Sequence, residues 1–312
     1  MKKVALIDYS SSSVSLLIAK TEGSVMESIL HTRTPLSFAS SIYQDRELTE
    51  IEILEILDIT DSFIITCKEN GVSKLYAIAS ANLSNIKGID SILDMVTKKT
   101  GLEIAKLDMA TEAEARLFAN ERYHILPHSA LIDFGSTTTK IYSFSDYISN
   151  VPLGPLTISQ DYVSEVIPTQ AEAKSIKAAI KEALDEANLP EEGFFENAVL
   201  AGVYAWAIYQ LYSEYYKLEY NHGEMIIQYK KLKKLAKYLI KSEERSMLIL
   251  KKAPELMKQV VPAVLLAKEL LKRFNINNIV ISDLGVKEGI LKSIVLGKRE
   301  QKGIEIEGKI YE

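Results

Sequence analysis

The chain has 312 residues, a length that favours two domains. Hydrophobic residues make up 47% and charged residues 25% of the sequence, which is typical of a globular protein and excludes a disordered or fibrous one. The net charge of −5 provides no overall attraction to nucleic acid or to an anionic membrane, so neither is expected as a partner. The single cysteine, Cys67, excludes an intrachain disulfide. With no signal-peptide pattern and no run of about 20 apolar residues, we expect a cytoplasmic protein.

The first half of the chain predicts an α/β layer. Three strands are expected first, over residues 3–8, 14–20 and 25–32. A loop over residues 33–46 is expected to follow them. A capping box at Thr49 and Glu52 begins a helix that the Asn70-Gly71 pair ends. The pattern then predicts a strand over residues 74–79, a helix over residues 89–99 and a strand over residues 102–107. A second helix is expected over residues 111–123, with a capping box at Thr111 and Glu114.

Pro127 and His128 mark the predicted joint between the domains. Strands are expected around Asp133 and Ile141, followed by a turn-rich segment over residues 151–155. The Thr169–Glu172 capping box predicts a helix over residues 169–187. A strand over residues 197–201 is expected next, with a helix after Gly202. Residues 224–271 are predicted to be largely helical, with breaks near Ser242 and Pro254, and residues 278–282 form the last predicted strand, which a short helix follows.

One polar stretch occurs twice, at residues 5–16 and 130–141. Each copy is an apolar strand that ends in Asp, then an aromatic residue, a small residue, a run rich in Ser or Thr, and a second apolar strand. The spacing is too long for a solenoid repeat. The repetition therefore predicts two related domains, each opening with the same β-hairpin.

These hairpins have the chemistry of a phosphate clamp if they face each other across a cleft. Turn N–H groups and hydroxyls can hold phosphoryl oxygens, and the carboxylates of Asp8 and Asp133 can hold a divalent cation directly or through water. The candidate phosphate-binding residues are Ser11, Ser12, Ser13, Gly135, Ser136, Thr137, Thr138 and Thr139. The alternative is ordinary turn chemistry, because Asp readily closes an Asx-turn and Ser is common in turns.

The motifs, in this order, resemble those of the exopolyphosphatase/guanosine pentaphosphate phosphohydrolase (Ppx/GppA) family, within the actin, sugar-kinase and chaperone ATPase superfamily. The resemblance runs nearly end to end and is that of a short, two-domain member. It rests on Ile7–Leu16, Ala79–Ala81, Thr100-Gly101, Glu114–Leu117, Asp133–Ile141, Pro152–Gly154, Pro254-Glu255 and Ser282-Asp283.

The resemblance implies two ribonuclease-H-like (actin-like ATPase) α/β domains that face each other across a central cleft. Their expected bounds are residues 1–126 and 127–312, with added helices in the second domain and the last residues packing back on the first. It also implies hydrolysis of the terminal phosphate of polyphosphate or guanosine pentaphosphate with Mg²⁺ as cofactor, and a homodimer as the assembly to consider. On this interpretation Asp8 and Asp133 position the metal, Asp133 is also catalytic, Lys140 contacts phosphate, and Glu114 is the candidate general base.

The chain departs from the family pattern at many positions that would bind phosphate or activate water. The departures are Ser10, Ser12, Ser15, Leu83, Ala113, Lys140, Leu256 and Lys258. They motivate a second hypothesis, a member that has lost catalysis and serves as a phosphate- or nucleotide-binding or regulatory protein. A third is an ATPase of the wider superfamily, because residues 135–140 also resemble the phosphate loop of activator ATPases. Those proteins often carry a cysteine-ligated iron–sulfur cluster, which Cys67 alone cannot supply.

A basic stripe is also predicted on one helix, at Lys230, Lys231, Lys233, Lys234 and Lys237. Such a stripe is usually a solvated helix face. The alternative is that it steers a polyanion towards the cleft.

Overall fold

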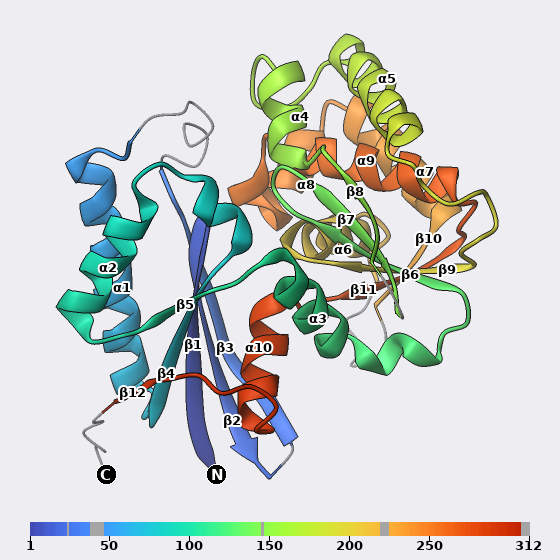
Figure 1. The fold of residues 1–312 in the computed structure, drawn as a ribbon. Helices are drawn as coiled ribbons and strands as arrows, with labels where there is room; N and C mark the ends of the chain where they lie inside the picture. The colour runs from blue at the N-terminus through green and yellow to red at the C-terminus, as the bar shows by residue number, and fades with distance from the viewer. Residues whose placement is uncertain (24, 38–46, 145–146, 219–224, 307–312) are drawn as a thin grey trace. The chain divides into compact units, whose positions relative to one another are not determined.

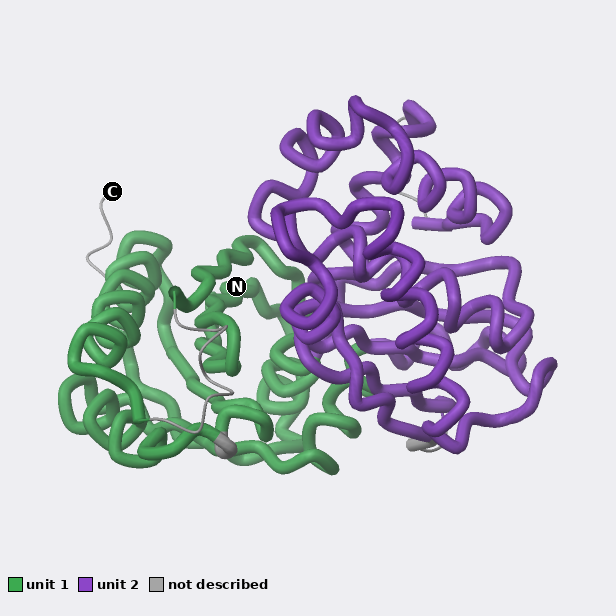
Figure 2. The backbone as a smooth tube through the Cα atoms, turned by 90° about the horizontal axis from the view of Figure 1, so that it is seen from above, with its two compact units in different colours: residues 1–119, 286–312 green, residues 120–285 purple. Residues whose placement is uncertain are grey.

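In the computed structural model the chain divides into two compact units (Figures 1 and 2), which are Met1–Ala119 with Val286–Glu312, and Asn120–Gly285. The structure describes residues 1–23, 25–37, 47–144, 147–218 and 225–306. Unit 1 is therefore discontinuous in sequence, because the last helix of the chain belongs with the first 119 residues. No helix in these ranges has the length and apolar character needed to cross a bilayer.

The sheet of unit 1 has the strand order β12-β4-β1-β2-β3, and β5 also pairs with β4. The first three strands are antiparallel, whereas β4 runs parallel to β1, and β5 parallel to β4. The elements are β1 (Lys2–Ser10), β2 (Ser13–Glu22), β3 (Val25–Pro35), α1 (Glu50–Glu69), β4 (Lys74–Ala79), α2 (Ile89–Thr100), β5 (Ile104–Lys106), α3 (Met109–Ala119), α10 (Val286–Val295) and β12 (Ile304–Glu305).

Helices cover both faces of this sheet (Figure 1). Because side chains alternate along a strand, Ile7 and Leu16 point into the core under α1 and α2. Leu6 and Leu17 point the other way and pack with Ile290 of α10. Asp8 shares the face of Leu6, so it lies on the side of the sheet that α3 and α10 cover.

The sheet of unit 2 has the order β10-β11-β9-β6-β7-β8. It repeats the pattern of unit 1, with an antiparallel β6-β7-β8 meander and β9 and β11 parallel to β6. The elements are β6 (Ser129–Phe134), β7 (Thr139–Ser143), β8 (Tyr147–Val151), α4 (Pro155–Tyr162), α5 (Gln170–Glu186), β9 (Asn197–Ala201), α6 (Val203–Tyr215), β10 (Ile226–Gln228), α7 (Tyr229–Lys241), α8 (Arg245–Lys252), α9 (Val260–Arg273) and β11 (Asn278–Ser282).

Most predicted elements are confirmed, including both capping boxes that involve Thr49 and Thr169. Other predictions were wrong at identifiable places. β3 continues to Pro35 where a loop was expected, and residues 38–46 of that loop lie outside the described ranges. The helix predicted from Thr111 begins earlier, at Met109, because Asp108 Oδ1 accepts the Thr111 N–H at 2.7 Å and caps it. The helix α4 and the strands β8, β10 and β12 were not predicted.

Candidate functional site

The two predicted hairpins form, and their Asp residues occupy the same register. Asp8 pairs with Ser15 across β1 and β2, and Asp133 pairs with Lys140 across β6 and β7. In both hairpins the partner stands seven residues after the Asp. In both units a parallel strand lies on the other side of the Asp, so the sequence repeat is also a repeat in three dimensions.

In unit 2, the carboxylate of Asp133 lies against the turn that follows β9. Asp133 is only 6% exposed, and a Cβ atom at Gly202 would stand 3.1 Å from its Oδ1. Gly202 has φ 94° and ψ 172°, a conformation that essentially only glycine adopts. The glycine thus lets the β9–α6 backbone pass close to the carboxylate. Lys140, opposite Asp133 in the sheet, is also buried, so a positive charge shares this face of the hairpin.

The turn of this hairpin is held by the first turn of α4 and by the residues just before it. The Ser136 carbonyl accepts the Leu156 N–H at 2.9 Å, and a Cβ at Gly154 would lie 2.4 Å from the Ser136 carbonyl oxygen. The buried Thr139 hydroxyl donates to the Leu153 carbonyl at 2.9 Å. The Thr139 hydroxyl is therefore engaged in holding the turn, whereas residues 135–138 are half-buried at its tip.

In unit 1 the turn is tighter, with only Ser11 and Ser12 between the strands. The Ser10 hydroxyl closes it by donating to the Ser13 carbonyl at 2.8 Å. Ser11 and Ser13 are buried, and Ser12 is half-buried at the tip. Of the predicted phosphate contacts in this turn, Ser12 is thus the most accessible.

An arginine from the segment expected to be a loop reaches this turn. Arg33 is the register partner of Ser15 on β3, so Asp8, Ser15 and Arg33 form one row across three strands on the same face. Its Nη2 lies 3.4 Å from the Ser12 hydroxyl oxygen. The Leu36 N–H bonds to the Ser12 carbonyl at 3.0 Å and ties the end of β3 to the turn. Ser15 replaces the Arg that the Ppx/GppA pattern would carry on β2, and Arg33 brings a guanidinium to the same row from β3.

Charged side chains from α3 and α10 surround Asp8. Desolvation raises the pKa of the half-buried Asp8 to about 6, the positive charge of Lys287 lowers it, and the negative charges of Glu112 and Glu288 raise it further. Arg116 also lowers this pKa. A carboxyl with a pKa near 6 beside further carboxylates and two cations is typical of a functional site.

The structure distinguishes Glu114, the sequence-based candidate for general base, from its neighbour Glu112. Glu114 is exposed on α3, whereas Glu112 is 4% exposed and its Oε1 accepts the Ala81 N–H at 2.8 Å. Glu112 therefore links α3 to the turn after β4, and it lies close enough to Asp8 to raise the pKa of that carboxyl. The buried carboxylate was hard to select from the sequence because two glutamates flank Ala113. Glu112 lies on the buried face of α3 together with Ala115, Arg116 and Ala119, and Glu114 does not.

The donor set fits Mg²⁺ better than a metal that is held by protein alone. Among the residues that the structure describes, no three His, Cys, Asp or Glu side chains are grouped so as to bind a metal ion. Mg²⁺ is usually held by one or two carboxylates together with substrate phosphates and water. Asp8 offers such a carboxylate, whereas the cation of Lys140 stands across from Asp133.

A family model described as the Ppx/GppA phosphatase family matches residues 17–298. The chain belongs to this family. Solved structures agree with the Ppx/GppA fold. An Aquifex aeolicus member of the family is 22% identical, with a TM-score of 0.75, over 96% of this chain and 99% of that chain. An exopolyphosphatase from Cytophaga hutchinsonii is 16% identical, with a TM-score of 0.77, over 95% of this chain and 98% of that one. No curated protein gave a significant match.

The matches establish the fold as two actin-like ATPase domains, which agrees with the repeated sheet topology of the two units. The joint between the units falls between Ala119 and Asn120, a few residues before Pro127. The helix α10 belongs with unit 1 and β12 pairs with β4, so the last described residues pack on the first unit. The domain bounds of 1–126 and 127–312 stay a prediction.

Proposed function

We propose that the protein is a Mg²⁺-dependent phosphoanhydride hydrolase that releases the terminal phosphate of inorganic polyphosphate or guanosine pentaphosphate. The observation that carries the proposal is the recurrence of an Asp in the same register of two polar-tipped hairpins, in a chain of the Ppx/GppA phosphatase family. The Cytophaga hutchinsonii neighbour, described as an exopolyphosphatase, supports polyphosphate as the substrate class.

Phosphate binding is assigned to the two turns and to the cations beside them. The half-buried tips, Ser12 and residues 136–138, offer hydroxyl and N–H donors. Arg33 and Lys140 supply positive charge, the first through a guanidinium that can bind two oxygens at once. Positioning and charge stabilisation account for most of the catalysis of phosphoryl transfer, so these contacts matter more than a strong nucleophile.

Asp8 is the better candidate ligand of Mg²⁺, which would neutralise phosphate charge when bound; Asp133 remains the second candidate and a proposed catalytic residue. We place the candidate base at Glu112, because it is buried beside Asp8, while Glu114, the sequence-based candidate, is exposed. The base would accept a proton from the attacking water.

Phosphate release from long-chain polyphosphate, with and without Mg²⁺, tests the proposal. Metal-dependent release that Asp133→Asn reduces by at least about a hundredfold would support it, with circular dichroism showing that the variant is folded. Absence of release from polyphosphate, guanosine pentaphosphate and nucleoside triphosphates by the folded protein would refute it.

A second candidate is a family member that binds phosphate compounds without hydrolysing them. It is favoured by Ala113 at the position of the family's first Glu and by the exposure of the adjacent Glu114. Saturable binding of polyphosphate in the same assay, without turnover, would identify this function. Specific binding of ADP that Gly202→Ala abolishes would instead favour the wider-superfamily ATPase.

A further inference from the structure

The helices α5, α7 and α9 of unit 2 enclose a pocket of about 290 Å³ that is rich in lysine. Six of its nine lining residues are lysines and none is acidic. We call it the lysine pocket, and its lining residues are Gln170, Lys174, Lys177, Lys233, Ala236, Lys237, Ile240, Lys241 and Lys268.

Three separate segments converge on this pocket. On α7, Lys233, Lys237 and Lys241 recur every four residues and so follow one side of the helix. The leucines of α7 are buried on the core side. α5 adds two lysines and α9 adds Lys268. The lysine pocket thus includes two lysines of the predicted basic stripe, Lys233 and Lys237, and four others that the tertiary structure brings to them.

The lysines crowd one another. Burial lowers the pKa of Lys177, and the charges of Lys268 and Lys241 lower it further, partly opposed by Glu269. Of the lining lysines, Lys268 pairs with Glu269. Positive charges held together in a concave site attract a multivalent anion, and a bound anion would reduce the repulsion between them.

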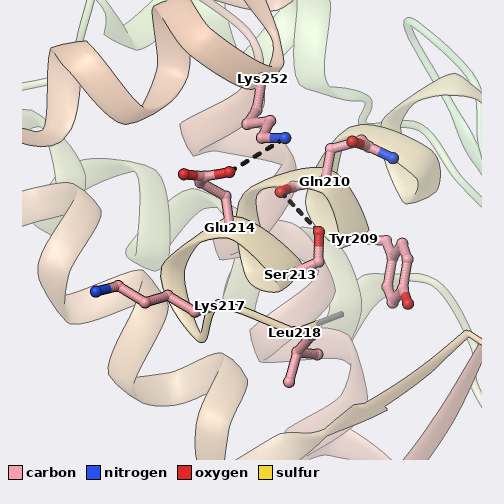
Figure 3. A pocket seen from close by; sticks show the side chains of 7 residues that line it. All are labelled: Tyr209, Gln210, Ser213, Glu214, Lys217, Leu218 and Lys252. Carbon is pink, nitrogen blue, oxygen red and sulfur yellow. Dashed lines mark hydrogen bonds and ion pairs between the residues drawn. The ribbon is translucent and has the colours of Figure 1, made fainter. Parts of the chain in front are cut away.

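A second pocket shows the contrast (Figure 3). It lies between α6 and α8, and Glu214 inside it bonds to Lys252 at 3.1 Å and to Lys251 at 2.5 Å. In this second pocket a lining lysine, Lys252, is therefore paired with a carboxylate of the same lining. The lining of the lysine pocket contains no acidic residue, and Glu269, which pairs with Lys268, lies outside that lining.

The lysine pocket is separate from the hairpin of unit 2. Ile132 and Phe134 point into the core that α5, α7 and α9 share. Asp133 lies between them on β6 and so points to the opposite face of the sheet. The pocket is lined by residues of α5, α7 and α9, helices that share the core on the side of the sheet away from Asp133.

We propose that the lysine pocket is a second binding site for linear inorganic polyphosphate, which holds a length of the substrate chain away from the hairpins. The choice of ligand rests on the proposed function. Lysine ammonium groups are mobile point charges that suit a flexible row of tetrahedral phosphates. Single-stranded nucleic acid is disfavoured, because its sites usually stack bases on aromatic side chains and the lining contains none.

Binding is measured directly with end-labelled long-chain polyphosphate by fluorescence anisotropy, with EDTA present so that Mg²⁺-dependent turnover is absent. The variant Lys237→Gln/Lys241→Gln should weaken binding at low salt by about tenfold and reduce the slope of log affinity against log salt by roughly one to two. The matched control is Lys230→Gln/Lys234→Gln, an exposed pair with the same spacing on the same helix but outside the lining. It should retain affinity within about twofold.

Equal losses in the two variants would overturn the proposal, since the effect would then be general charge. Equal competition by a single-stranded DNA of matched charge would overturn the choice of polyphosphate. If the first variant melts early, Lys174→Gln/Lys177→Gln on α5 provides the same comparison. A protein that binds polyphosphate through the pocket but hydrolyses none would uphold this inference and refute the proposed hydrolase. Hydrolysis lost in Asp133→Asn, with pocket-dependent binding unchanged, would support both.

Discussion

At the scale of single residues, Arg33 shows how a changed position can be offset by a neighbour in space. A family motif read along β2 records only the loss of an arginine at Ser15. The register places Arg33 one strand away, on the same face and 3.4 Å from Ser12. The row formed by Asp8, Ser15 and Arg33 thus keeps a guanidinium charge, although the arginine of the sequence motif is lost.

We therefore expect Arg33→Gln to raise the KM for polyphosphate about tenfold with a smaller effect on kcat, because a charge-assisted hydrogen bond contributes roughly 1.5–3 kcal/mol. Arg33→Lys should restore part of the affinity, since it retains the charge but not the fork geometry. Steady-state kinetics measures both, with Arg273→Gln in unit 2 as the control. An unchanged KM in Arg33→Gln would exclude the guanidinium from substrate binding.

Asp8 should limit both stability and activity through its pKa of about 6, which is raised from 3.8. Folding favours the protonated form of the Asp8 carboxyl. The stability of the protein that depends on this group is therefore fully present below about pH 3.8 and is lost as the pH rises through about 6. Asp8→Asn should therefore raise the melting temperature at pH 8 by roughly 2–6 °C, with no gain at pH 4. The same variant should lose Mg²⁺-dependent activity, and wild-type activity should fall as the pH drops below about 6.

Thermal denaturation at the two pH values, with Asp94→Asn as an exposed control on α2, separates this effect from a general change in charge. A variant that is destabilised equally at pH 4 and pH 8 would contradict desolvation of the Asp8 carboxylate as the cause of the raised pKa.

At the scale of elements, the contact between α3 and α10 positions the charged groups around Asp8. Gly289 on α10 meets the backbone of α3 so closely that a Cβ would lie 1.8 Å from the Ala115 carbonyl oxygen. The next residues towards the helix start are Glu288 and Lys287, whose charges act on Asp8. The close approach therefore helps to fix the site as well as the fold.

Gly289→Ala should destabilise the protein by about 2 kcal/mol or more, because overpacking exceeds the gain of about 1 kcal/mol in helix propensity. Chemical denaturation measures the free energy of unfolding. Ser293→Ala on the same helix should change it by less than about 0.5–1 kcal/mol. Equal stability of Gly289→Ala and the wild type would show that the two helices can separate at little cost.

At the scale of the whole molecule, unit 1 is assembled from both ends of the sequence. α10 contributes Ile290 and Leu291 to the core that covers one face of the first sheet. Unit 2 is continuous, from Asn120 to Gly285. The two units therefore respond differently to removal of the last 27 residues.

A chain that stops at Gly285 should lose cooperative folding of unit 1, because each of the two large side chains contributes roughly 1.5–3 kcal/mol by burial. Limited proteolysis followed by mass spectrometry should then show cleavage within residues 1–119 and protection of residues 120–285. Protection of both parts in the truncated chain would contradict the assignment of α10 to unit 1.

The sequence by itself determined the local elements, the repeated hairpin and the family, because these depend on short-range periodicity, capping residues and motif order. Thr49 and Thr169 cap their helices as predicted. Only the tertiary structure decided which charges meet. It brought Arg33 to Ser12, turned Glu112 inward and left Glu114 exposed, and gathered six lysines from three helices. Strand register and helix packing set these distances, and both depend on residues far apart in the chain.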